Sequence, residues 1–143
     1  MKPAPPVRAD YRAFHRITTR WMDNDVYGHV NNVVYYSFFD TVVNGHLVEA
    51  GVLDFEAGTT IGLVVETTCS YFAPIAFPDA VTGGLRVDRI GTSSVQYGVG
   101  IFRGDEDNAA AAGHFVHVYV GRETRRPVPI PDDLRAVLEA VKA

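Results

Sequence analysis

Asp23-Asn24-Asp25-Val26-Tyr27-Gly28-His29-Val30-Asn31-Asn32 is a polar stretch that runs directly into the most apolar segment of the chain, Val33-Val34-Tyr35-Tyr36-Ser37-Phe38-Phe39-Asp40-Thr41-Val42-Val43. The polar stretch holds two carboxylates separated by one residue, a glycine, a histidine and several asparagines. Such a stretch before an apolar helix has two interpretations. It is either a helix cap or a reactive site at the N-terminus of the helix.

The apolar segment favours a long helix that is buried on most sides. At 100° per residue, its apolar side chains cover an arc of about 200°, whereas a surface helix needs a stripe of only ~100°. The abundance of Val, Tyr and Phe leaves two buried strands as a competing interpretation. We prefer the helix because the run lacks period-2 alternation and is followed by Gly45 and Gly51, which suit helix termination.

Most of the remaining chain has the pattern of β-strands. Strands are predicted over residues 11–22, 61–72, 80–90, 93–102 and 110–120. Small residues on one face of 93–102, Gly98 and Gly100, would let another backbone come close. His114 and His117 fall on opposite faces of their strand and are not expected to form a pair. A short final helix is predicted over 132–142, capped by Asp132 or Asp133.

The order of these elements predicts an α+β protein of the hot-dog type. One strand, a long helix and four strands in a meander would form an antiparallel sheet of about five strands wrapped round the central helix. The short C-terminal helix would lie outside this unit. We expect a flexible, proline-rich N-terminal arm over residues 1–10 and a single domain over residues 11–143.

Composition excludes several classes of protein. The chain has 143 residues, a formal net charge of -4 and no lysine cluster, which argues against nucleic acid or an anionic membrane as its main partner. Its one cysteine, Cys69, cannot form an internal disulfide. No secretory signal and no apolar run of ~18 residues is present. A cytoplasmic location is therefore the default expectation.

The polar stretch also resembles a known family. Arg20-Trp21-Met22-Asp23-Asn24-Asp25-Val26-Tyr27-Gly28-His29-Val30-Asn31-Asn32 is similar to the helix-entry motif of the 4-hydroxybenzoyl-CoA thioesterase family. Tyr71-Phe72-Ala73-Pro74-Ile75 and Arg89-Ile90-Gly91-Thr92-Ser93-Ser94-Val95 also look like the family, so the likeness covers about residues 12 to 122. It implies a hot-dog acyl-CoA or aryl-CoA thioesterase with no cofactor beyond the CoA of its substrate. It also implies a homo-oligomer, a dimer or tetramer, whose sheets pair edge to edge with sites between subunits.

The resemblance assigns roles within the motif. Asp25 falls on the catalytic aspartate, and the backbone N–H of Asn32 falls on part of the oxyanion hole, while Asp23 matches a more variable acidic position. The chemistry is consistent, because a helix N-terminus presents free N–H groups to a developing oxyanion. A carboxylate just upstream serves as nucleophile or as general base, and the sequence leaves both open. The structural alternative is that Asp23 and Asp25 stabilise the helix start or pair with Arg20.

Other residues are weaker candidates. His29 is either a supporting group near the carbonyl or a structural histidine, and Tyr35 belongs either to the core or to an acyl pocket. The remaining candidates for substrate binding are Tyr71, Arg89, Ser93 and Ser94, and the arginines considered for CoA phosphates are Arg89, Arg122, Arg125 and Arg126. No metal site is expected, because no second histidine lies near His29 in sequence.

Two other functions compete with hydrolysis. A non-catalytic acyl-CoA-binding module would keep the fold without using Asp25. A hot-dog dehydratase is less consistent with the sequence, because its usual Asp and His motif on the central helix is not found here.

Overall fold

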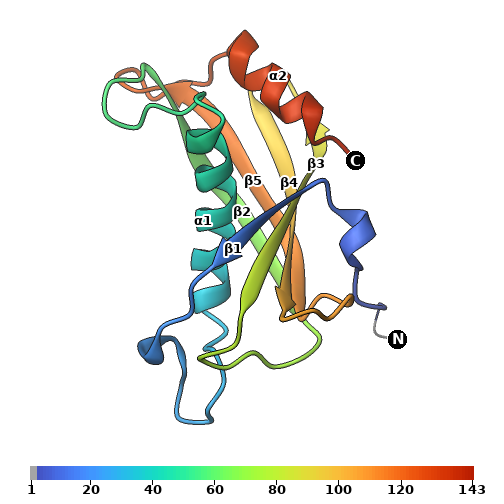
Figure 1. The fold of residues 1–143 in the computed structure, drawn as a ribbon. Coiled ribbons are helices and arrows are strands. Elements are labelled where there is room, and N and C mark those ends of the chain that lie inside the picture. Colours follow the sequence, from blue (N-terminus) through green and yellow to red (C-terminus); the bar gives the residue numbers. More distant parts are fainter. Residues whose placement is uncertain (1–2) are drawn as a thin grey trace.

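A computed structural model describes residues 3–143 and confirms the predicted hot-dog architecture, a five-stranded antiparallel sheet packed against one long helix (Figure 1). The strands are β1 (Ala13–Ile17), β2 (Thr60–Tyr71), β3 (Val81–Ile90), β4 (Ser94–Arg103) and β5 (Ala111–Gly121). The helices are α1 (Val34–Glu49) and α2 (Asp132–Ala140), and two short 3₁₀ turns are η1 (Arg8–Asp10) and η2 (Trp21–Asp23).

The order of strands in the sheet differs from the predicted meander. The order is β1-β3-β4-β5-β2, so only β3, β4 and β5 follow one another as neighbours. β2 comes directly after the helix in sequence but pairs with β5, with Tyr71 opposite Ala111. Alternation of apolar residues identifies a strand but not its neighbour, which is why the sequence did not reveal this crossing. The result is that β2 forms one edge of the sheet and β1 the other.

The long helix is buried along one face rather than on most sides. Its buried residues recur at helical spacing: Tyr35, Phe38, Phe39, Val42, Val43 and Leu47. Tyr36 and Val48 remain 38% and 45% exposed, because the sheet covers a single side of α1 (Figure 1). Gly45 does not end the helix as predicted. Gly51 follows its end with φ 76°, the left-handed conformation typical of a helix C-terminus.

The small residues of β4 make room for side chains, not for another backbone. A Cβ at Gly100 would lie 2.6 Å from the Tyr11 ring, and one at Gly98 would lie 2.8 Å from Nε of Arg86. Tyr11 packs with Phe102 into a small second core on the face of the sheet opposite α1. We call this the outer face.

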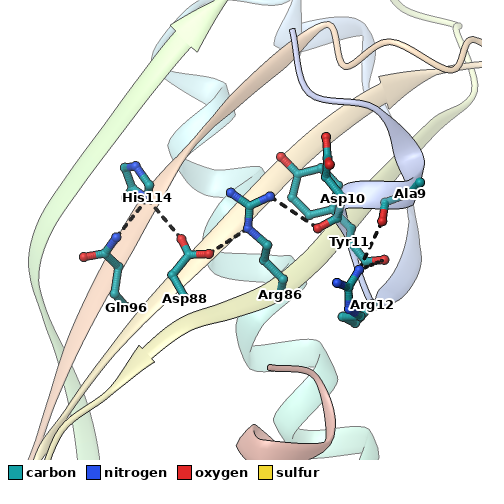
Figure 2. A network of polar contacts seen from close by, with 8 residues as sticks. All are labelled: Ala9, Asp10, Tyr11, Arg12, Arg86, Asp88, Gln96 and His114. Carbon is teal, nitrogen blue, oxygen red and sulfur yellow. Dashed lines mark hydrogen bonds and ion pairs between the residues drawn. The ribbon is translucent and has the colours of Figure 1, made fainter. Parts of the chain in front are cut away.

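A polar network extends along the outer face (Figure 2). Arg86 donates from Nε to Oδ1 of Asp88 at 2.7 Å and from Nη1 to the carbonyl of Asp10 at 3.3 Å. Nδ1 of His114 lies 3.3 Å from Oδ2 of Asp88 and 3.1 Å from Nε2 of Gln96. His117 is only 2% exposed, and the ladder places it on the opposite face from His114, as predicted. We call Arg86, Asp88, Gln96 and His114 the outer-face network.

The ends of the domain differ in detail from expectation. The predicted strand over 11–22 is shorter, because η2 interrupts it. Within the predicted arm, the carbonyl of Pro6 accepts from Ala109 and Arg8 donates to the carbonyls of Gly104 and Glu106; residues 1 and 2 lie outside the described part. The N-cap of α2 is Pro131, with Asp132 and Asp133 in the first turn.

Neither helix of the described residues combines the length and apolar character that a membrane crossing requires.

Candidate active site

A tight turn presents Asp25 in front of α1. The N–H of Asp25 donates to the carbonyl of His29 at 2.9 Å, and the N–H of Gly28 donates back to the carbonyl of Asp25 at 3.1 Å. Gly28 has φ 81°, a left-handed conformation that glycine adopts without steric cost. The turn between aspartate and helix therefore depends on the glycine of the motif.

The same turn is attached to the connection between β2 and β3. Val30 is buried, and its N–H donates to the carbonyl of Ile75 at 2.7 Å. On the other side of the turn, Oδ1 of Asn24 accepts from the N–H of Phe77 at 3.0 Å. Because both sides are fixed to residues 75–77, Asp25 lies on an ordered turn rather than a free loop.

Asp23 has a structural position, which agrees with the structural alternative of a pair with Arg20. The side chain is 1% exposed. Its Oδ2 accepts from the backbone N–H of Arg20 at 2.8 Å, and its Oδ1 accepts from Nη2 of the same arginine at 2.8 Å. Its carboxylate is thus occupied in closing η2.

Asp25 is half-buried, and its carboxylate is engaged on one side only. Oδ1 accepts from the N–H of Tyr27 at 2.9 Å, which holds the side chain in a defined orientation. Oδ2 has no hydrogen-bond partner within residues 3–143. One carboxylate oxygen is therefore left for a ligand or a water molecule.

The helix entry leaves one backbone donor unpaired. Oδ1 of Asn31 accepts from the N–H of Val33 at 3.0 Å, and the carbonyl of Asn31 accepts from the N–H of Val34 at 2.9 Å. The carbonyl of Asn32 accepts from the N–H of Tyr35 and from the hydroxyl of Tyr71. The N–H of Asn32 itself has no partner in the described part of the chain. This is the donor that the family resemblance implies for the oxyanion hole.

These groups line one open cleft with a volume of about 470 Å³. Its lining residues are Asp25, Tyr27, His29, Val30, Asn32, Tyr35, Tyr71, Phe72, Ala73 and Pro74. Five of the predicted site residues therefore meet in one place, although they come from the turn, from α1 and from the end of β2.

Two tyrosines connect the cleft wall to the helix. The rings of Tyr35 and Tyr71 pack edge to face, with centroids 5.1 Å apart. Burial raises the pKa of Tyr35 to about 12 and raises the pKa of Tyr71 above its ordinary value. Both phenols therefore keep their protons at neutral pH, and the Tyr71 hydroxyl uses its proton in the bond to the carbonyl of Asn32.

The other predicted substrate-binding residues lie away from this cleft within the single chain. Ser94 pairs with Val118, which pairs with Leu63, and Leu63 is eight residues before Tyr71 on β2. At ~3.3 Å per residue the separation along the strand is about 26 Å. Ser93 adjoins Ser94. The exposed Arg89 pairs with Gln96, and the ladder from Gln96 across β5 reaches β2 at a position five residues before Tyr71. Their roles in binding stay predictions.

The four arginines considered for CoA phosphates are not equivalent. Arg122 donates from Nε to the carbonyl of Gly58 at 2.6 Å and from Nη2 to the carbonyl of Phe55 at 2.7 Å. It therefore holds the loop before β2, whereas the described contacts include no side-chain partner for Arg89, Arg125 or Arg126.

Sequence reasoning could find one side-chain contact of the helix entry and missed the other. Asn31 is typical of a turn or cap residue, and its side-chain oxygen caps the entry at the N–H of Val33. Its position two residues before the capped N–H is a local signal that sequence can provide. The bond from Tyr71 to Asn32 joins residues 39 apart and has no local signal. Among the described residues, no group of three or more His, Cys, Asp or Glu side chains is arranged to hold a metal ion.

Comparisons with known proteins agree with this architecture. A family model described as the thioesterase-like superfamily matches residues 19–138. The crystal structure of the PA5185 protein from Pseudomonas aeruginosa strain PAO1 has a TM-score of 0.95 and 55% sequence identity, covering 97% of both chains. The PA2801 protein from Pseudomonas aeruginosa, a candidate thioesterase, has a TM-score of 0.80 and 30% identity, covering 87% of this chain and 96% of its own.

A third solved structure, a predicted thioesterase from Bacillus stearothermophilus, has a TM-score of 0.77 and 25% identity, and covers 91% of this chain and 96% of its own. The search of curated proteins finds no match.

Proposed function

The chain belongs to the thioesterase-like superfamily, and on that basis we propose that it hydrolyses acyl-CoA or aryl-CoA thioesters in the manner of the 4-hydroxybenzoyl-CoA thioesterase family. One observation carries the proposal. The unpaired N–H of Asn32 and the carboxylate of Asp25, whose Oδ2 has no partner in the described residues, line the same cleft. These are the two groups that hydrolysis of a thioester requires.

The N–H of Asn32 would stabilise the charge that develops on the carbonyl oxygen. When a nucleophile adds to the thioester carbon, the C=O electrons move to oxygen and create an oxyanion. A preorganised donor at that position is worth about 3 kcal/mol of transition-state stabilisation. The first turn of α1 adds the positive end of the helix dipole.

Asp25 would supply either the base or the nucleophile. As a base, it takes a proton from water while the water oxygen bonds to the carbonyl carbon, and the C–S bond then breaks to release CoA thiolate, which takes up a proton. As a nucleophile, its oxygen forms a mixed anhydride with the acyl group as thiolate leaves, and water then hydrolyses the anhydride. Both routes give the free acid and CoA.

The walls of the cleft suit an acyl or aryl group. Tyr27, Tyr35, Tyr71 and Phe72 provide aromatic surface, and His29 is an exposed side chain at the rim that could hydrogen-bond near the carbonyl. Arg89, Arg125 and Arg126 stay as candidates for the CoA phosphates, and Ser93 and Ser94 for the pantetheine arm.

The proposal includes a homo-oligomer, a dimer or tetramer, formed through β2. This edge strand pairs on one side with β5 and exposes the apolar side chains of Leu63, Val64 and Val65. An exposed apolar edge is a template for pairing with another strand. Pairing of two copies would also bring the distant end of one sheet toward the cleft of the other, where Ser93 and Ser94 would come within reach. Light scattering with size-exclusion chromatography measures the assembly.

The decisive experiment measures thiol release from a broad panel of acyl-CoA, aryl-CoA and acyl-carrier-protein thioesters. Wild type is compared with Asp25→Asn and with Asp54→Asn as a matched control. Asp54 lies outside the cleft. Like Asp25, it accepts hydrogen bonds from nearby backbone N–H groups, in this case those of Glu56 and Ala57. We expect activity in wild type and Asp54→Asn and its loss in Asp25→Asn. A wild type that hydrolyses nothing yet is stabilised by CoA would instead be a binding module.

A further inference from the structure

The last residue of β2 is bonded directly to the helix entry. The hydroxyl of Tyr71 donates to the carbonyl of Asn32 at 2.9 Å. A second acceptor contact of that carbonyl, from the N–H of Tyr35, is longer at 3.3 Å. Tyr71 therefore makes the shorter of the two contacts that hold this peptide group.

The peptide groups on both sides of Asn32 are fixed by different partners. The preceding peptide carries the unpaired N–H of Asn32, and its carbonyl, that of Asn31, accepts from Val34. The following peptide has its N–H on the side-chain oxygen of Asn31 and its carbonyl on Tyr71. Since the two peptides share the Cα of Asn32, fixing the second peptide anchors the atom from which the first carries its free N–H. The hydroxyl of Tyr71 supplies part of that anchor.

The ring of Tyr71 is itself held in place. It packs edge to face on Tyr35 at a centroid distance of 5.1 Å and an interplanar angle of 87°. Tyr35 is 3% exposed and belongs to the main core. The contact thus continues from the core, through both rings, to the carbonyl of Asn32.

We propose that Tyr71 is a positioning residue, whose hydroxyl orients the N–H of Asn32 toward the oxyanion of the reacting thioester. This inference rests on the proposed hydrolase function. It adds to the predicted substrate contact of Tyr71 a role that acts through Asn32. Its effect should fall on the transition state, because the oxyanion exists there and not in the bound substrate.

Tyr71→Phe tests the role with little change in packing, since the ring and its contact with Tyr35 are retained. With the best substrate of the panel, we expect kcat to fall about tenfold, the size of one net hydrogen bond. KM should stay within about twofold, as expected when an interaction is made chiefly in the transition state. Tyr36→Phe is the matched control, because Tyr36 neighbours Tyr35 on α1 and its hydroxyl has no hydrogen bond in the described residues.

A second measurement separates positioning from general stability. Amide hydrogen exchange followed by NMR should show faster exchange of the N–H groups of Val33 and Tyr35 in Tyr71→Phe, which are bonded at the peptide that Tyr71 holds, with unchanged rates at core positions of α1 such as Val42. A general loss of stability would instead accelerate all of these amides together.

The outcomes distinguish this inference from the function on which it rests. An active wild type with an unchanged kcat in Tyr71→Phe overturns the positioning role and leaves the hydrolase function intact. A loss of kcat with an unchanged KM and faster exchange at Val33 and Tyr35 supports it. A wild type that hydrolyses no thioester overturns the proposed function and with it any catalytic purpose of Tyr71. The exchange data still decide whether its hydroxyl holds Asn32.

Discussion

The helix entry and the outer-face network are both rich in polar groups, yet they are built in opposite ways. On the outer face, Arg86 and Asp88 pair with each other, and the Asp88 oxygen without a hydrogen-bond partner among the described residues, Oδ2, is buried 3.3 Å from Nδ1 of His114. At the helix entry, Asp23 is satisfied by Arg20, while Asp25 and Asn32 each keep one group that has no partner in residues 3–143 and faces the cleft. Charged or polar residues alone therefore do not mark a site. The mark is a group held in a fixed position by its neighbours and left unpaired toward a cleft.

The largest expected effect is a loss of activity at the helix entry with little loss of stability. Asp25→Asn should lower kcat at least about 100-fold, since a positioned acid–base or nucleophilic group contributes at least that much. Its hydrogen bond with Tyr27 can be retained by the amide oxygen, so the urea midpoint should change little. Thiol release and urea unfolding measure the two quantities. Equal losses of activity in Asp25→Asn and in an outer-face variant would remove the distinction.

A third kind of polar group, unpaired but enclosed, sharpens the comparison. Both ring nitrogens of His117 are buried without a hydrogen-bond partner in residues 3–143, among the rings of Tyr97, Phe115 and Tyr119. Burial lowers the pKa of His117 from 6.5 to about 4. Between these values the unfolded chain binds a proton that the folded protein does not, so stability is lost as the pH falls.

We expect this loss to total about 3 kcal/mol between neutral pH and pH ~4. Urea unfolding at several pH values should therefore show a shallower pH dependence in His117→Leu than in wild type. Parallel curves for the two proteins would mean that His117 takes up its proton equally well in both states.

Breaking the outer-face network should affect stability alone. Arg86→Met removes the partner of the partly buried Asp88, whose side chain is 19% exposed. We expect a loss of about 2 kcal/mol in the free energy of unfolding, below the 3–5 kcal/mol typical of a fully buried pair. The double variant Arg86→Met, Asp88→Leu should recover part of this loss, because it leaves no unpaired carboxylate. A reduced kcat at saturating substrate would show that the outer face contributes to catalysis after all.

The smallest effect concerns the far half of the long helix. Gly45 lies inside α1, and a Cβ at this position would meet no atom within 4 Å. Gly45→Ala should therefore stabilise the protein by about 0.5–1 kcal/mol without changing kcat. Thermal unfolding and thiol release check the two parts. A change in kcat would show that helix stability as a whole, rather than the bonds at its entry, governs the site.

Local patterns predicted the elements better than their arrangement. Val95, Tyr97, Val99 and Ile101 alternate with small or polar residues in the sequence, which predicts one apolar face of a strand, and all four are buried. The long helix and the turn containing Gly28 were likewise readable, because each depends on residues near one another in sequence. The place of β2 beside β5 was not, since pairing is decided by packing between distant segments.

The same division holds for the candidate site. Asp25 and Asn32 lie seven residues apart in one motif, so the resemblance of that motif alone predicts both. Tyr71 was proposed for the substrate, but its bond to Asn32 crosses from the edge strand to the helix and depends on tertiary structure. Ser93, Ser94 and Arg89 were proposed as contacts for CoA, and their distance from the cleft follows from strand register alone.

The attachment of the helix entry to an edge strand has a thermodynamic consequence. β2 has a free edge, and its last residue holds the carbonyl of Asn32, so ordering of this strand and ordering of the proposed oxyanion donor are linked equilibria. Linkage is reciprocal. A strand that adds to β2 should raise affinity for a transition-state analogue, and such an analogue should tighten self-association by the same factor. The degree of self-association of this protein would then depend on ligand concentration, and its ligand affinity would depend on protein concentration.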